Sequence, residues 1–225
     1  MTLSDKLYKI LIEGGSWKTI LSGLWVTVKI SLFSLIIGTL LGAFICLLRT
    51  CKNPVLRTIA KVYIAILRGT PVLMLLLLLY YGIFARTGLE PVTVAIVTFS
   101  LNVSAHVAEL LRAAVEASDK GQTEAARTLG FSAWDAFRLI TLPQVLKVAK
   151  PVYQSTVVNL IQWTSVVGYV TITDLTRVIN NTASRTMQPL LTIIIGMLIY
   201  LGLSYIVYGI FALTDRHKKK GGGTE

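Results

Sequence analysis

The sequence predicts an all-α, polytopic membrane protein with five transmembrane helices, and three observations support this. Of the 225 residues, 54% are hydrophobic and only 15% are charged, whereas a soluble domain carries about 25% charged residues. Five stretches are long and apolar enough to cross roughly 30 Å of bilayer hydrocarbon, which takes about 20 helical residues. The net charge of +11 is typical of basic loops that flank membrane spans. The composition therefore argues against a soluble enzyme, a disordered chain and a nucleic-acid-binding module.

The five predicted spans cover residues 30–48, 69–85, 91–108, 151–173 and 190–213. The first helix is expected to begin near Ile20, with Lys29 reaching toward the interface, and the second near Ile59. A signal peptide is a poor alternative for the first span, because the span is too long and no small-residue cleavage site follows it. Gly38 and Gly42, four residues apart, predict a surface where another helix packs closely.

Lys and Arg residues are unevenly distributed between the connections, and this bias sets the orientation of membrane proteins. With the N-terminus outside, the cytoplasm would receive 14 of them. The opposite face would receive 6. The sequence therefore predicts an outside N-terminus and an inside C-terminus.

The predicted organisation is an N-terminal interfacial segment (1–19), a membrane domain (20–213) and a basic cytoplasmic tail (214–225). Apolar residues recur at helical spacing over residues 3–13, as in a helix that lies in the membrane interface. Cys46 and Cys51 have no His or Cys cluster near them in the sequence, so they are interpreted as reduced thiols. Neither a disulfide nor a metal site is expected.

The long connection between the third and fourth spans contains a motif with strict spacing. It reads Glu124-Ala125-Ala126, three residues, Gly130, nine residues, and Ile140-Thr141-Leu142-Pro143. Residues 124–129 are good helix formers, and Gly130 is suited to end that helix in the left-handed conformation. Ser132 is expected to cap a second helix, with Asp135 in its first turn, and Pro143 to end or bend that helix.

This spacing matches the EAA signature of bacterial ABC importer permeases at every fixed position, so the chain resembles that family. Over about residues 23–213 it looks like the type I, polar amino-acid branch, with Arg68-Gly69-Thr70-Pro71 and Thr164-Ser165 among the supporting pieces. It departs from the usual pattern at His106, where a Tyr is common, and at Gln162-Trp163, where a Lys-Asp or Lys-Glu pair is common. These departures fall near the presumed transport pathway.

The resemblance implies a permease subunit, not an enzyme, in the bacterial inner membrane. It implies pairing with a second permease subunit of the same or another sequence, two ATPase subunits that dock on cytoplasmic coupling helices, and an external amino-acid-binding protein. The residues to which it assigns ATPase coupling are Gly121, Glu124, Ala125, Ala126, Gly130, Leu142 and Pro143. A phosphate-binding loop is absent from the sequence, since Gly14–Thr19 lacks the glycine before Lys18. ATP and magnesium are therefore expected in the partner ATPase, with no cofactor bound by this chain.

Polar residues inside hydrocarbon are costly and usually functional, so they are the candidates for a substrate pathway. Asn102, His106 and Glu109 share one helical face in the third span. Arg68 could meet a substrate carboxylate or pair with Glu109. A second set lies in the fourth span: Asn159, Gln162, Thr164 and Ser165. In the alternative interpretation, the charged residues lie at the cytoplasmic boundary and only cap helices or pair with one another.

Two rival functions remain open at this point. The chain could be a secondary transporter or channel driven by an ion gradient, with His106 and Glu109 as a proton relay, or a structural membrane scaffold. For the importer, residues 111–114, 119–122 and 184–186 slightly favour cystine as substrate, and arginine, histidine and glutamine remain alternatives. Whether the permease pair is homomeric or heteromeric is also open.

Overall fold

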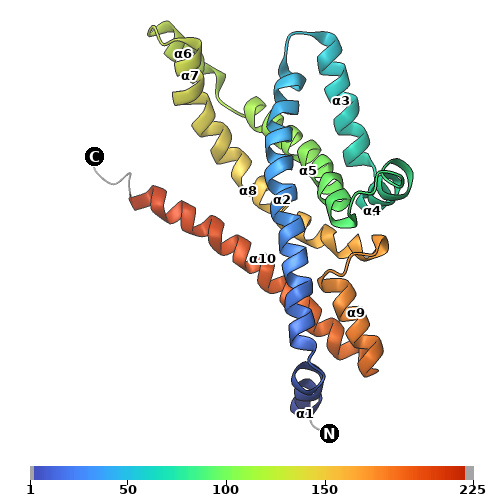
Figure 1. Cartoon of the computed structure of the whole chain (residues 1–225). Coiled ribbons are helices and arrows are strands. Elements are labelled where there is room, and N and C mark those ends of the chain that lie inside the picture. Colours follow the sequence, from blue (N-terminus) through green and yellow to red (C-terminus); the bar gives the residue numbers. More distant parts are fainter. Residues whose placement is uncertain (1–2, 221–225) are drawn as a thin grey trace. The chain divides into compact units, whose positions relative to one another are not determined.

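The computed structural model describes residues 3–220, which are helical over most of their length and contain no strand (Figure 1). In chain order the elements are α1 (Leu3–Tyr8), the π-helical η1 (Lys9–Glu13), α2 (Ser16–Thr50), α3 (Pro54–Gly69), α4 (Val72–Leu77), the π-helical η2 (Leu78–Ile83), α5 (Pro91–Glu116), α6 (Lys120–Thr128), α7 (Ala133–Ala136), the π-helical η3 (Phe137–Thr141), α8 (Leu142–Trp163), the 3-10 helical η4 (Thr164–Val170), α9 (Leu175–Thr186) and α10 (Pro189–Lys220). The all-α fold class is thus confirmed, and a short helix does cover residues 3–13. Part of the predicted basic tail lies outside the described residues.

Three helices in the described range are long and apolar enough to cross a membrane. They are Ser16–Thr50, Pro91–Glu116 and Pro189–Thr214. A fourth span results if the helical pair Pro54–Gly69 and Val72–Ile83 is counted as one. The predicted first, third and fifth spans lie within the three long helices.

The second span differs from the prediction because its helix is interrupted. Thr70 is extended, with φ −99° and ψ 131°, and Pro71 follows it. Proline disfavours helical backbone at the preceding residue and has no N–H to donate. A span expected as one helix from about Ile59 to residue 85 is therefore two helices with a break between Gly69 and Val72.

The fourth span also has different bounds. Its helix α8 begins at Leu142 rather than at Pro151, and Pro151 lies inside it. The α-helix stops at Trp163, where the tighter η4 takes over and ends at Thr171 in left-handed backbone with φ 68°. The helix therefore begins earlier than the predicted span of residues 151–173, because an internal proline did not stop it, and its last turns changed type.

Pro143 neither ends the helix that Ser132 caps nor separates it from α8. The Ser132 cap itself is confirmed, since the Asp135 N–H donates to the Ser132 hydroxyl over 3.0 Å. After α7 the backbone passes through η3, and Pro143 is the second residue of α8. The wider π-helical turn just before the proline accommodates a residue that lacks an N–H, so the helical path continues.

The structure divides into two compact units. Unit 1 contains Met1–Leu35, Pro71–Phe99 and Val157–Glu225, and unit 2 contains Ile36–Thr70 and Ser100–Thr156. Helices α2, α5 and α8 each contribute one part to each unit.

Unit 2 confirms the predicted packing surface of α2. A Cβ placed on Gly38 would lie 2.8 Å from the Val103 side chain, and one on Gly42 would lie 2.6 Å from Cβ of Val107. The two glycines of α2 thus meet two valines of α5 with the same four-residue spacing. Close backbone approach of this kind is the usual function of small residues in membrane helices.

Unit 1 contains a helix, α9, that the sequence did not predict. Asp174 caps α9, and its carboxylate accepts the backbone N–H groups of Thr176 and Arg177. One face of α9 is buried, and α10 packs against the helix (Figure 1). The residues of its buried face are Leu175, Val178, Ile179, Thr182 and Ala183. This helix was missed because its apolar positions are few and polar residues dominate the segment.

Candidate functional site

The predicted coupling segment forms the exposed helix α6 of unit 2. Asp119 caps it, and the carboxylate accepts the N–H of Gly121 over 2.9 Å. Ala126 is buried, whereas Glu124 and Ala125 are exposed. The motif therefore divides into one alanine that anchors the helix and two residues that another protein can reach.

Gly130 ends this helix in left-handed backbone, as the sequence predicts, with φ +91°. The Phe131 N–H donates to the Ala126 carbonyl over 3.1 Å, and the Gly130 N–H to that of Arg127 over 3.2 Å. The Arg127 guanidinium closes the turn by donating to the Phe131 carbonyl over 2.6 Å. A Cβ at residue 130 would meet no other atoms within 4 Å, so the backbone conformation rather than space requires glycine there.

Polar side chains brace α6 against the start of α8. Gln144 accepts the Asp119 N–H over 3.0 Å and donates to the Gln122 side chain over 2.9 Å. The hydroxyls of Thr123 and Thr141 are 3.0 Å apart. Leu142 and Pro143 open α8 next to these braces. The sequence did not indicate Gln122, Thr123 or Gln144, which lie just outside the motif, or Thr141, which occupies its variable position between Ile140 and Leu142.

Apolar side chains near α6 and α7 are exposed to an unusual degree. Leu129 is 79% exposed, Trp134 66% and Leu139 56%, and Trp134 and Phe137 have ring centres 5.9 Å apart. We call Leu129, Phe131, Trp134, Phe137 and Leu139 the apolar docking patch. Exposed apolar side chains that lie near one another are typical of protein interaction sites.

The first group of predicted pathway residues lies in unit 2. Asn102 is 3% exposed, and its side-chain amide donates to the Leu67 carbonyl over 3.0 Å. Its Oδ1 atom has no hydrogen-bond partner within residues 3–220. His106 is half-buried one turn further along α5, and Arg68 is exposed.

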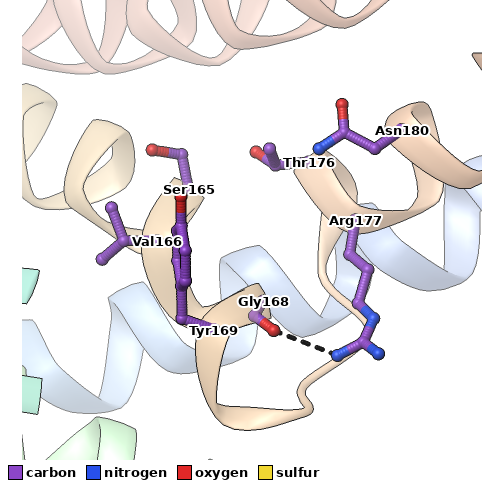
Figure 2. Close-up of a pocket in the computed structure, with 7 residues that line it drawn as sticks. All are labelled: Ser165, Val166, Gly168, Tyr169, Thr176, Arg177 and Asn180. Carbon is purple, nitrogen blue, oxygen red and sulfur yellow. Dashed lines mark hydrogen bonds between the residues drawn. The ribbon is translucent and has the colours of Figure 1, made fainter. Parts of the chain in front are cut away.

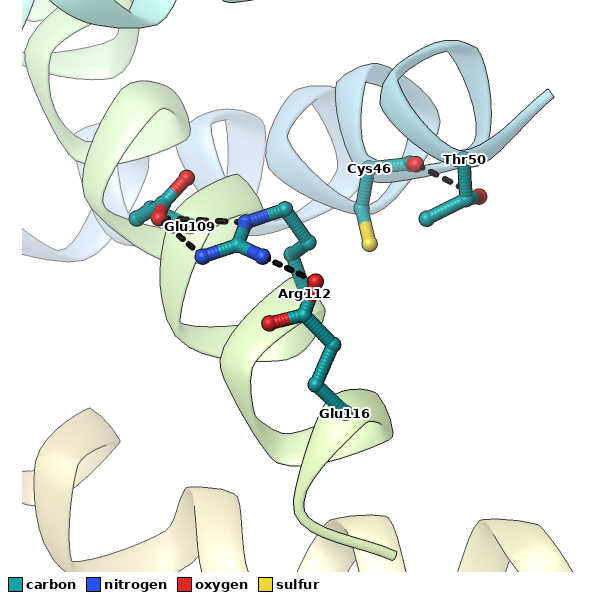
Figure 3. Close-up of polar contacts among 5 residues, drawn as sticks. All are labelled: Cys46, Thr50, Glu109, Arg112 and Glu116. Carbon is teal, nitrogen blue, oxygen red and sulfur yellow. Dashed lines mark hydrogen bonds and ion pairs between the residues drawn. The ribbon is translucent and has the colours of Figure 1, made fainter. Parts of the chain in front are cut away.

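Glu109 pairs with Arg112 rather than with Arg68 in the described part of the chain. The guanidinium of Arg112 contacts the Glu109 carboxylate over 2.6 Å and also pairs with Glu116, so it bridges two turns of α5 (Figure 3). Both carboxylates come from the same helix as the arginine. The expected pairing of Arg68 with Glu109 is therefore corrected, and the ion pairs favour the alternative in which Glu109 and Arg112 pair with each other.

The second group of pathway residues lies in unit 1. Asn159 and Gln162 are exposed on α8. Thr164 is fully buried, and its hydroxyl donates to the Ile161 carbonyl over 2.7 Å. Ser165 lines a hollow between η4 and α9. The 3-10 helix η4 begins at Thr164, so Asn159 and Gln162 precede the change of helix type and Thr164 and Ser165 follow it.

Comparison with known proteins identifies relatives over most of the chain. Residues 34–220 match the family described as binding-protein-dependent transport system inner membrane component. The probable amino-acid ABC transporter permease protein YckA of Bacillus subtilis (strain 168) is 38% identical over 194 residues, or 85% of this chain and 84% of YckA. The L-cystine transport system permease protein TcyL of the same organism is 35% identical over 220 residues, or 94% of this chain and 89% of TcyL.

A solved structure shares the fold. The crystal structure of an amino acid ABC transporter with histidines contains a chain that is 30% identical and superposes with a TM-score of 0.83. The match covers 96% of this chain and 100% of that one.

Proposed function

The chain belongs to the family of binding-protein-dependent transport system inner membrane components, and we propose that it forms half of the membrane pathway of a bacterial amino-acid importer. It is a permease of an amino-acid ABC transport system and not an enzyme. The observation that carries this conclusion is the extent of the similarity to YckA and TcyL, together with a coupling motif complete at every fixed position. ATP hydrolysis belongs to separate subunits.

We propose five spans in the bacterial inner membrane, with the N-terminus outside and the C-terminus inside. They are α2, the broken helix of α3, α4 and η2, then α5, the pair α8 and η4, and α10. The excess of Lys and Arg in the connections assigned to the cytoplasm supports this orientation. We assign residues 1–19 to an interfacial segment, 20–213 to the type I permease domain, and 214–225 to the basic tail.

The coupling site is α6 together with the start of α8. Glu124 and Ala125 are exposed for contact with an ATPase subunit, and the apolar docking patch beside them supports such a contact. Movement of α6 would reach α8 through Gln144 and through the pair of Thr123 and Thr141. ATP and magnesium bind to the ATPase, and this chain needs no cofactor.

The solute pathway involves the two groups of polar residues. Asn159 and Gln162 belong to the same helix that begins with Leu142 and Pro143, so a displacement of its coupled end can reach them through continuous backbone. Exposed amides in a membrane helix face water, solute or a partner rather than lipid. We also assign Arg68, His106 and the neighbouring residues Asn102 and Glu109, all in unit 2, to the pathway. A second permease subunit and an external binding protein complete the importer.

We propose a polar amino acid as substrate, and L-cystine is the first compound to test because TcyL is named for it. The experiment measures uptake of labelled L-cystine, L-arginine, L-histidine and L-glutamine by vesicles that contain the chain, its ATPase and its binding protein. ATP-dependent uptake of one of them is expected. Uptake that persists without the ATPase and follows a proton gradient would instead support a secondary transporter.

A further inference from the structure

A hollow of about 440 Å³ lies within unit 1, between η4 and the first turns of α9. Its volume falls within the range of small-molecule sites. Ser165, Val166, Gly168 and Tyr169 form one side, and Thr176, Arg177 and Asn180 form the other (Figure 2). Only Ser165 among these was a candidate on sequence grounds. The hollow therefore collects a guanidinium, two aliphatic hydroxyls and an amide that the coupling site does not use.

Arg177 is held in place but retains most of its binding capacity. Its guanidinium donates to the Gly168 carbonyl over 3.0 Å, and Figure 2 shows it turned back toward that residue. This bond uses one of five N–H donors. Within the described residues, no carboxylate forms an ion pair with Arg177. The nearby Asp174 accepts backbone N–H groups with both of its oxygens. An anchored guanidinium with free donors is suited to bind a carboxylate in two-point fashion.

One other polar group of the hollow, the Thr176 hydroxyl, is fixed by the layer behind it. The Thr176 hydroxyl lies 2.8 Å from that of Tyr200 on α10. The backbone N–H of Leu175 donates to the Thr27 hydroxyl of α2 over 3.3 Å. The first turn of α9 is thus tied to two other helices of the unit. A site whose side chains are already positioned loses little entropy when it binds a solute.

We propose that this hollow is a subsite for the transported amino acid, in which Arg177 binds the α-carboxylate and Ser165, Thr176 and Asn180 contact its other polar groups. The inference rests on the proposed function and orientation, which put the connection between the fourth and fifth spans outside. The hollow would then receive the solute before it enters the membrane. The hollow has one cationic end and one uncharged hydrogen-bonding end, which match the two ends of a zwitterion.

The experiment measures binding to the permease–ATPase complex in nanodiscs, without binding protein, by saturation-transfer NMR. The probes are L-cystine, L-arginine, L-histidine and L-glutamine, and the α-carboxamide of each. Wild type is expected to bind at least one amino acid about tenfold or more tightly than its amide, since a charge-assisted pair is lost in the amide. Arg177→Met should bind the amino acid and its amide equally weakly. The preference of Arg177→Lys for the acid should lie between those of wild type and Arg177→Met. Asn180→Ala should weaken binding while preserving the preference for the acid.

Arg86→Met is the matched control, because it removes a charge from the same proposed side of the membrane without touching the hollow. It should bind as wild type does. The inference is overturned if Arg177→Met still prefers the acid over the amide, or if wild type binds none of the probes. It is also overturned if Arg177→Met binds normally but loses ATPase stimulation by the binding protein, because the guanidinium then contacts that protein. ATP-dependent uptake by the same wild-type preparation tests the proposed function separately.

Discussion

The side-chain amide of Asn102 on α5 donates a hydrogen bond to the Leu67 carbonyl of α3 over 3.0 Å. In an uninterrupted helix, this carbonyl would accept the N–H of residue 71. Residue 71 is a proline and has no N–H to donate. Asn102 thus supplies the donor that the proline removes, and a backbone carbonyl at the break in the second span is satisfied from another helix.

Asn102→Ala is expected to lower the free energy of unfolding by about 1–3 kcal/mol, because a buried carbonyl loses its donor. The melting temperature of the purified protein in nanodiscs measures this. Asn181→Ala, at an exposed asparagine of α9, is the control and should change little. Equal melting temperatures for Asn102→Ala and wild type would show that water or rearrangement replaces the bond.

Gly42→Ala is expected to destabilise the protein by about 1–3 kcal/mol through overpacking. The added Cβ would lie 2.6 Å from Cβ of Val107 and 2.8 Å from the Ser104 carbonyl, both in a neighbouring helix. Gly202→Ala in α10 is the matched control, since a Cβ there meets nothing within 4 Å. That control should be neutral or stabilising by up to about 1 kcal/mol, because alanine favours helix. Thermal unfolding of both variants tests the difference, and a neutral Gly42→Ala would contradict the close packing.

The features that depend on local sequence pattern were predicted correctly. Long apolar runs predicted the helices around residues 16–50, 91–116 and 189–220. The spacing after Glu124 predicted a helix ended by Gly130 and a second helix capped by Ser132, and both are found. These features are encoded within a few residues of one another, so no distant contact has to be known.

Features that depend on tertiary partners were missed. Hydropathy does not depend on backbone hydrogen bonds. The helix break at Pro71 and the hydrogen bond by which Asn102 compensates for it were therefore not predicted. The hydrogen bond from Arg177 to the Gly168 carbonyl joins residues that are nine positions apart in the sequence and belong to different helices, α9 and η4. Gln144 follows Pro143, the last residue of the motif, so the signature does not include it. In each case the deciding partner lies outside the window in which a sequence pattern can be recognised.

Asp174 predicts a pH dependence of stability. Burial raises the pKa of its carboxyl above the usual range, although the N–H groups of Arg177 and Thr176 oppose this rise. A raised pKa in the folded state means that folding favours the protonated form. The contribution of this group to stability is therefore fully present below its ordinary pKa and is lost as the pH rises through the raised value.

Asp174→Asn should remove the pH-dependent contribution of this carboxyl to stability. The melting temperature of the variant relative to that of wild type should therefore fall as the pH is lowered from 7 toward 4. Asp119→Asn makes the same change at the exposed cap of α6 and serves as the control. A difference between Asp174→Asn and wild type that stays constant with pH, measured by thermal unfolding, would rule out the burial effect.

The proposed orientation predicts which loops an impermeant thiol reagent reaches from outside the cell. With Cys46 and Cys51 replaced by serine, Asn180→Cys should be labelled in intact cells and Asp135→Cys only after the membrane is opened. Both positions are exposed in the structure, so accessibility depends on the side of the membrane. The reverse pattern would invert the orientation and remove α6 from the cytoplasm.

The ratio of ATP hydrolysed to amino acid taken up by proteoliposomes tests the central claim most directly, that the chain is a permease driven through α6. Wild type should show uptake only with ATP, and the loaded binding protein should stimulate hydrolysis. Gly130→Trp should insert and keep its helical content but lose both uptake and stimulation, because the left-handed turn and the docking surface are disturbed. Gly88→Trp, at another left-handed glycine with φ +69° and open space, should behave as wild type. Uptake without ATP, or normal coupling in Gly130→Trp, would contradict the account.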